Sequence, residues 1–61
     1  MKTYIFSFVG YNKAGERIVE DIRERVSICE DLMDIKERHA MALEEEFKKP
    51  FVCAEIREVA E

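Results

Sequence analysis

Tryptophan is absent from this 61-residue chain, and proline, histidine, glycine and cysteine each occur only once or twice. The two glycines, Gly10 and Gly15, do not form the glycine-rich loop that cradles a phosphate or a dinucleotide. The most apolar stretch, residues 4–11, is far shorter than the roughly 20 residues of a membrane-spanning helix. A chain this short also has little room for a deep substrate cleft. These absences argue against an enzyme, a small-molecule substrate and a membrane protein.

The two cysteines, Cys29 and Cys53, lack the close spacing of a redox or metal-binding pair. The first residues show no charged segment, apolar segment and cleavage site of a secretory signal peptide. We therefore expect both thiols to stay reduced and to pack as small apolar groups. The expected location is the cytoplasm.

The charge balance is acidic, with a formal net charge of −4. Residues 1–30 are neutral overall, so the acidic excess lies in residues 31–61. Nucleic-acid binding normally needs a basic surface, which makes it an unfavoured interpretation. The best argument for the alternative, a small nucleic-acid-associated regulator, is the set Arg17, Arg23 and Arg25 beside Tyr11. Asp21 lies among these arginines and opposes that alternative.

Residues 2–11 are rich in aromatic and β-branched side chains, which indicates a strand. Alternation places Tyr4, Phe6 and Phe8 on one face. The following Asn12-Lys13-Ala14-Gly15 is typical of a turn closed by a glycine bulge between antiparallel strands.

This turn predicts that residues 17–26 form a second strand in which Ile22 lies opposite Phe6, Ile18 opposite Gly10 and Val26 opposite Lys2. That register gathers the apolar residues of both strands on one face, with Glu20 and Glu24 at its margin. Residues 15–49 could instead form one long helix, because residues 16–25 are rich in helix formers. A change in the apolar stripe near Ser27 favours the strand, and the long helix remains the alternative.

Residues 28–49 show helical periodicity, with Ser27 and Glu30 as a predicted capping box at the start and Pro50 after the end. The predicted inward stripe comprises Ile28, Leu32, Ile35, His39, Ala42 and Leu43. Residues 51–59 read as a third strand, with Val52, Ala54 and Ile56 facing the core. Residues 1–61 are therefore expected to form a single α+β domain of order β-β-α-β, a largely antiparallel three-stranded sheet with one amphipathic helix on one face.

His39, the only histidine, is a candidate for a general base or metal ligand together with Cys29, Cys53 or a nearby carboxylate. It lies within the apolar stripe of the helix, so a half-buried ring bonded to a strand backbone, Glu20 or Glu24 is the favoured interpretation. The acidic run Glu44–Glu46 is interpreted as a solvated helix end. We predict no catalytic residue, no cofactor and no metal.

The other face of the sheet is the most informative surface. Thr3, Ile5, Ser7, Val9, Tyr11 and Val19 are expected to face outward, with Phe51 and Cys53 as further candidates. A solvent-exposed sheet face usually alternates to polar residues more cleanly, so a partner site is slightly favoured over scattered apolar residues. The predicted interface residues are Ile5, Val9, Tyr11, Arg17, Val19 and Arg23.

The order of strand, N-x-x-G turn (Asn12 to Gly15), strand, capped helix and strand in an acidic chain resembles small accessory proteins encoded by phages or mobile elements, including host-takeover and anti-CRISPR factors. The resemblance implies a non-enzymatic protein that binds and blocks a larger host protein. The expected function is thus a protein-binding module whose partner is a second copy, in a homodimer, or a host protein that it modulates or inhibits. A structural protein of unknown role is the remaining alternative.

Overall fold

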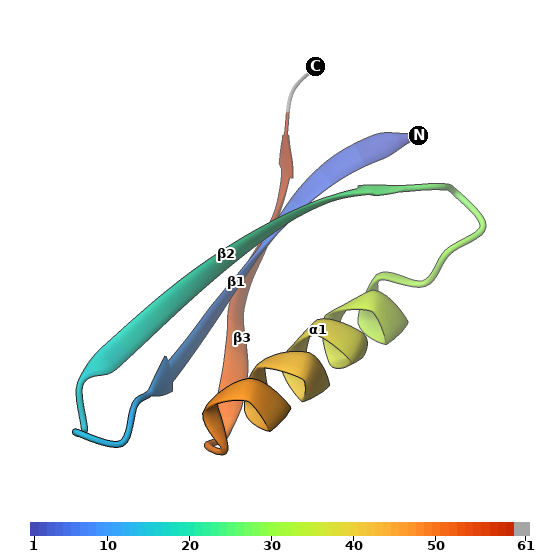
Figure 1. The fold of residues 1–61 in the computed structure, drawn as a ribbon. Helices are drawn as coiled ribbons and strands as arrows, with labels where there is room; N and C mark the ends of the chain where they lie inside the picture. The colour runs from blue at the N-terminus through green and yellow to red at the C-terminus, as the bar shows by residue number, and fades with distance from the viewer. Residues whose placement is uncertain (60–61) are drawn as a thin grey trace.

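The computed structural model describes residues 1–59, which form three strands and one helix (Figure 1). In chain order these are β1 (Lys2–Tyr11), β2 (Arg17–Val26), α1 (Leu32–Phe47) and β3 (Phe51–Val59). The sheet has the order β2-β1-β3, and both pairs are antiparallel. The β-β-α-β order and the α+β class are as predicted. Residues 17–26 are a strand, which excludes the long-helix alternative; residues 60 and 61 lie outside the described part.

The β1–β2 hairpin has the predicted turn and register. The backbone N–H of Gly15 donates to the carbonyl of Asn12 at 3.0 Å, and Gly15 has a φ of 81°. The Asn12 side chain accepts the backbone N–H of Glu16 at 2.9 Å. Phe6 lies opposite Ile22, Gly10 opposite Ile18 and Lys2 opposite Val26. The turn therefore sets which side chains of both strands share the helix-covered face.

The helix begins four residues later than predicted, because Ser27 and Glu30 form a separate turn. The N–H of Glu30 donates to the Ser27 carbonyl at 3.2 Å, and the Ser27 hydroxyl to Glu30 Oε1 at 3.4 Å. Asp31 is the true N-cap, and its side chain accepts the N–H of Met33 at 2.9 Å. Ile28, predicted on the buried stripe, is consequently 91% exposed in the β2–α1 connection.

Two further helix predictions are corrected. The helix ends at Phe47 rather than Lys49, because Lys48 takes a left-handed conformation with φ 57° and donates its N–H to the Glu44 carbonyl at 2.8 Å. Ala42 is exposed, and Ala40 packs against the core in its place. Ile35 and Leu43 are buried, as predicted.

The third strand contains a bulge that sequence periodicity did not reveal. Ser7 pairs with Glu55 and Phe8 with Cys53, so Ala54 is the additional residue. The side chains of β3 therefore change face at Ala54. Phe51 is buried, Cys53 and Ile56 pack against the core, and Val52 is 67% exposed. The predicted inward Val52 and Ala54 are thus wrong, as is the outward placement of Phe51 and Cys53.

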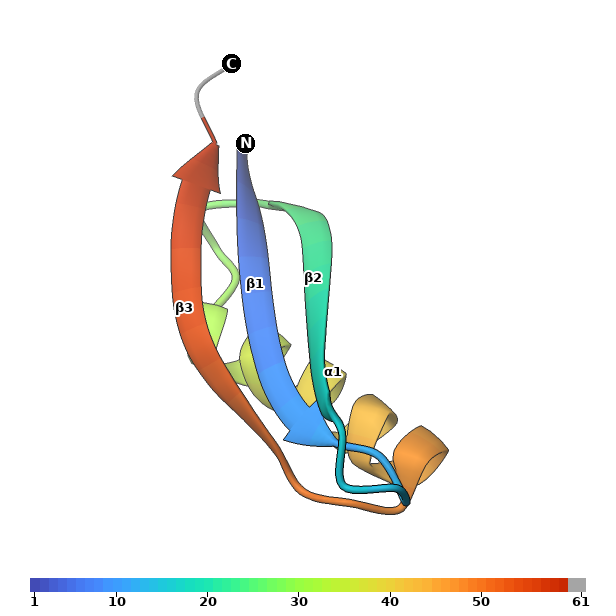
Figure 2. The same ribbon diagram turned by 90° about the vertical axis from the view of Figure 1, so that its left-hand side faces the viewer.

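The helix α1 lies across one face of the sheet (Figures 1 and 2), and the core is formed by buried side chains of both. The Phe51 ring lies directly over Gly10, where a Cβ atom would come within 2.8 Å of two ring carbons. Phe47 packs against the same ring in a tilted arrangement, with centroids 5.1 Å apart and an interplanar angle of 41°. The buried hydrophobic residues are Phe6, Phe8, Val26, Ile35, Leu43 and Phe51.

Candidate interface on the open sheet face

One face of the sheet carries no helix, and Figure 2 shows it in front of α1. Phe6 and Phe8 face the helix, so the odd-numbered residues of β1 face the other way. Their cross-strand partners share that face. We call this surface the open face. Within residues 1–59, no helix or strand covers it.

Three valines form a row straight across the open face. Val9 of β1 lies opposite Val19 of β2 and opposite Val52 of β3. We call these three residues the valine row. Val19 is 51% exposed and Val52 is 67% exposed, whereas the central Val9 is half-buried between them. Tyr11, one position further along the same face of β1, is 55% exposed. Together they make an apolar patch near the hairpin turn.

Charged side chains lie beyond this patch in ordered rows. Next to the valine row is an acidic row, in which Ser7 lies between Asp21 and Glu55. The next is an arginine row, in which Ile5 lies between Arg23 and Arg57. Arg57 Nε lies 3.4 Å from Glu55 Oε1, so the two rows are joined by an ion pair along β3.

On its other side the valine row is bordered by Arg17, which lies opposite Tyr11. Beside it a shallow hollow of about 360 Å³ is lined by Val9, Gly10, Tyr11, Lys49, Pro50 and Val52. Basic groups therefore lie on one side of the valine row, and acidic groups lie on the other.

The six predicted interface residues all lie on the open face, although their use by a partner stays a prediction. Tyr11, Arg17, Val19 and Arg23 are exposed, whereas Ile5 and Val9 are half-buried. Thr3, also expected to face outward, is buried at 4% exposure. Sequence reasoning missed Val52 because the bulge at Ala54 was not foreseen. Glu55 and Arg57 were not named, although alternation from the inward Ile56 already places both on the outer face. One available signal was that Phe51 and Ile56, both large and apolar, can share a face only if the strand contains an extra residue.

The three arginines of β2 lie on the open face without forming a continuous basic stripe. Asp21 separates Arg17 from Arg23, and Glu55 and Arg57 neutralise each other on β3. A surface that tracks a phosphate backbone would need adjacent basic groups. The arrangement of charge therefore favours a partner with both signs of charge.

His39 lies on the opposite, helix-covered side. Its Nε2 is 3.4 Å from Glu24 Oε1 and its ring centroid is 6.0 Å from that of Phe6. The ring is half-buried beside Glu24, as favoured from the sequence, but Nε2 has no hydrogen-bond partner among the described residues. Within residues 1–59, no group of three histidine, cysteine or acidic residues has metal-binding geometry. Cys29 and Cys53 are both free thiols.

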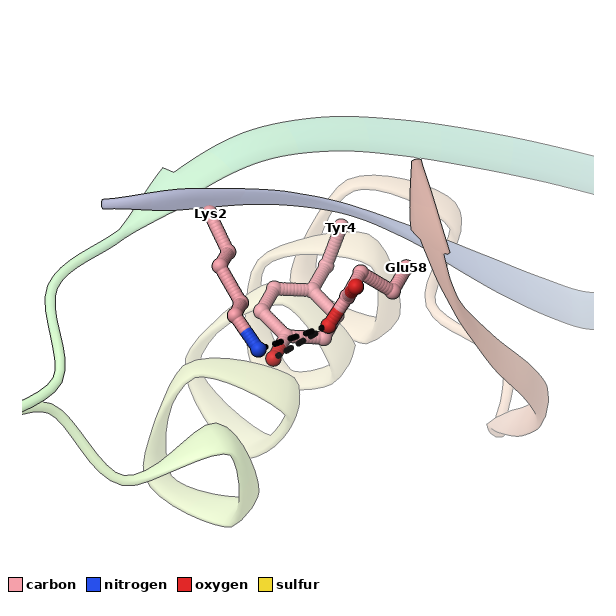
Figure 3. A network of polar contacts seen from close by, with 3 residues as sticks. All are labelled: Lys2, Tyr4 and Glu58. Atoms are coloured by element: carbon pink, nitrogen blue, oxygen red, sulfur yellow. Dashed lines mark hydrogen bonds and ion pairs between the residues drawn. The ribbon is translucent and has the colours of Figure 1, made fainter. Parts of the chain in front are cut away.

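A polar network joins β1 to β3 at the end of the sheet farthest from the hairpin turn. Lys2 Nζ lies 3.2 Å from Glu58 Oε1, and the Tyr4 hydroxyl donates to the same oxygen at 3.5 Å (Figure 3). The hydrogen bond and charge of Glu58 raise the pKa of the Lys2 ammonium above its ordinary value. This network joins β1 to β3 and contributes nothing to the open face.

Comparison with protein-family models, curated proteins and solved structures finds no significant match for this chain. No helix in the described part is long and apolar enough to cross a membrane. The proposals below therefore depend on the geometry of the open face.

Proposed function

We propose that this protein is a non-enzymatic protein-binding module that binds its partner with the open face. The valine row carries the proposal. Three β-branched apolar side chains lie side by side across the full width of the sheet, and two of them are more than half exposed. A sheet face that meets only water usually carries polar residues at such positions, so an apolar row across all three strands favours a partner site.

The surroundings of the valine row support the same function. Specific interfaces have an apolar centre and a polar rim. Here Val9 and Val52 supply the centre, while Arg17 and Asp21 lie one row away on either side. Tyr11 is an amphipathic aromatic of the type enriched among residues that dominate binding energy.

Site-specific photo-crosslinking in cells of the source organism tests this proposal. A photoreactive phenylalanine analogue replaces Tyr11 in one variant and Met41 in another. Met41, on the outward side of α1, is 68% exposed and is the matched control. We expect discrete protein adducts from position 11 and none from position 41.

A second pair of variants separates binding from folding. Val19→Asp places a charge in the valine row, whereas Ala42→Asp places one on the exposed side of α1. With the photoreactive group at position 11, Val19→Asp should abolish the adducts and Ala42→Asp should retain them. Adducts that survive Val19→Asp in a folded variant, or that form equally from position 41, would contradict the proposal.

A further inference from the structure

We propose that the partner at the open face is a second copy of this chain, related by a two-fold axis that runs across the strands along the valine row. This inference rests on the proposed function and names the partner. Two-fold symmetry requires each surface to be complementary to itself. The order of the rows on the open face decides which axis meets that condition.

An axis parallel to the strands fails this test. Each row would lie over the same row of the second copy. The arginine row would face an arginine row, and the acidic row would face an acidic row. Like charges in direct opposition are unfavourable, and such an arrangement would bring Arg23 against Arg57 and Asp21 against Glu55.

An axis across the strands at Val9 meets the condition. On each strand, a residue two positions before the valine then lies over the residue two positions after the valine in the second copy. Asp21 therefore lies opposite Arg17 of the second copy, and the symmetric pair repeats the contact. Ser7 lies opposite Tyr11 of the second copy. The valine row lies over itself at the centre, and the arginine row lies at the rim.

The third strand agrees with this placement. Glu55, in the acidic row, comes over the segment of the second copy that contains Lys49 and Pro50. That segment borders the hollow beside Val52 on the basic side of the valine row. The symmetry thus joins acidic to basic groups at both edges of the sheet.

The area available indicates a reversible dimer. With the axis at Val9, the strand segments that overlap are residues 7–11 of β1 and their partners, about 17 Å long. Three strands about 4.8 Å apart then present a flat area of about 250 Å² per copy, or about 500 Å² for the pair. Specific interfaces below about 1,200 Å² belong to the weaker, transient class. We therefore expect a weak dimer, with the Asp21 and Arg17 contacts setting its register rather than supplying most of its affinity.

Charge exchange measured by sedimentation equilibrium tests both the partner and the register. The wild-type chain should approach twice its 7.2 kDa monomer mass as its concentration rises. Asp21→Arg and Arg17→Asp should each weaken the dimer at least about tenfold, because each places two like-charged pairs in the interface. The double variant should recover most of the wild-type affinity.

Matched controls keep the test independent of folding and of net charge. Glu37→Arg and Arg38→Asp change the charge by the same amounts as the two interface variants, at exposed positions on α1. Both should dimerise like the wild type, and circular dichroism should show that every variant is folded.

Three outcomes would overturn the inference. A wild-type chain that stays monomeric into the millimolar range excludes the second copy. Recovery of Asp21→Arg by Arg23→Asp instead of Arg17→Asp places the axis between the acidic and arginine rows. Equal loss in the α1 controls means that the effect is one of net charge. The crosslinking experiment separates failure of this inference from failure of the proposed function. If position 11 crosslinks to a different protein, the open face is still a protein-binding surface, but its partner is not a second copy.

Discussion

Gly10 lies where the Phe51 ring crosses the central strand, and the missing side chain makes that crossing possible. A Cβ atom at this position would come within 2.8–2.9 Å of three ring carbons. Phe51 cannot move freely, because it is buried and packs against Phe47. We predict that Gly10→Ala lowers the free energy of unfolding by about 1–3 kcal/mol, measured by urea denaturation.

Two further variants identify the cause of that loss. Phe51→Leu removes the ring, so the double variant should lose clearly less than the sum of the two single losses. Gly15→Ala is the comparison without a steric contact, because no atom lies within 4 Å and only its φ of 81° is unfavourable. Gly15→Asn should lose less stability than Gly15→Ala, since asparagine tolerates this left-handed conformation. A Gly10→Ala variant as stable as the wild type would contradict the proposed contact.

Lys2 and Glu58 give a pH prediction at the residue scale. The folded state raises the pKa of Lys2, mainly through the hydrogen bond and charge of Glu58. The contribution of this pair is therefore fully present below the ordinary lysine pKa and is lost as the pH rises through the folded value. Nuclear magnetic resonance titration of the Lys2 side chain should show this raised pKa, and Glu58→Gln should return it toward the ordinary value. An unchanged Lys2 pKa in that variant would show that Glu58 is not the cause.

At the scale of elements, β3 shows how one additional residue redirects a strand. Phe51 and Cys53 face the helix, and so does Ile56, because Ala54 adds one residue between them. Deleting Ala54 should leave the same three side chains on that face in a regular strand. We predict a folded protein within about 1 kcal/mol of wild-type stability. Deleting Val52 instead moves Phe51 to the open face, and should cost at least about 3 kcal/mol. Thermal denaturation of the two deletion variants measures both stabilities. Equal losses of stability would contradict the assignment of Ala54 as the additional residue.

The elements differ in how well local sequence predicts them. The β1–β2 hairpin was predictable to the residue, because Asn12 and Gly15 specify the turn and the turn specifies the register. The start of α1 was not, since both Ser27 and Asp31 have capping side chains and the choice depends on the path of the chain from β2 to the helix. The bulge in β3 arises from fitting Phe51 and Ile56 to one core.

The open face was predictable only in part for the same reason. Its β1 and β2 residues follow from the hairpin register, and six of them were identified. The outward position of Val52 on β3 follows from the bulge, which depends on packing across the sheet. The valine row therefore became visible only when Val52 was placed beside Val9. Self-complementarity of the rows is likewise a property of three assembled strands.

At the scale of the whole molecule, the core within residues 1–59 consists of six buried hydrophobic residues. A chain of 61 residues buries only about 60% of the surface that its unfolded form exposes, so its stability margin is small. Replacing a single core residue therefore removes a large fraction of the total free energy of unfolding. Any additional burial, such as that of the valine row against a second copy, would add to stability in proportion to the dimer formed.

This linkage gives a prediction that needs no knowledge of the partner's biological role. If the folded chain associates and the unfolded chain does not, mass action makes the Tm depend on protein concentration. For a domain of this size we expect the Tm to rise by about 3–6 °C for each tenfold increase in concentration above the dissociation constant. Val9→Asp should remove this dependence, because it places a charge at the centre of the valine row. Ala42→Asp, which adds the same charge on the exposed side of α1, should retain it. A wild-type Tm that is independent of concentration over this range would show that self-association does not stabilise the fold, and a slope that persists in a folded Val9→Asp protein would place the self-interface elsewhere.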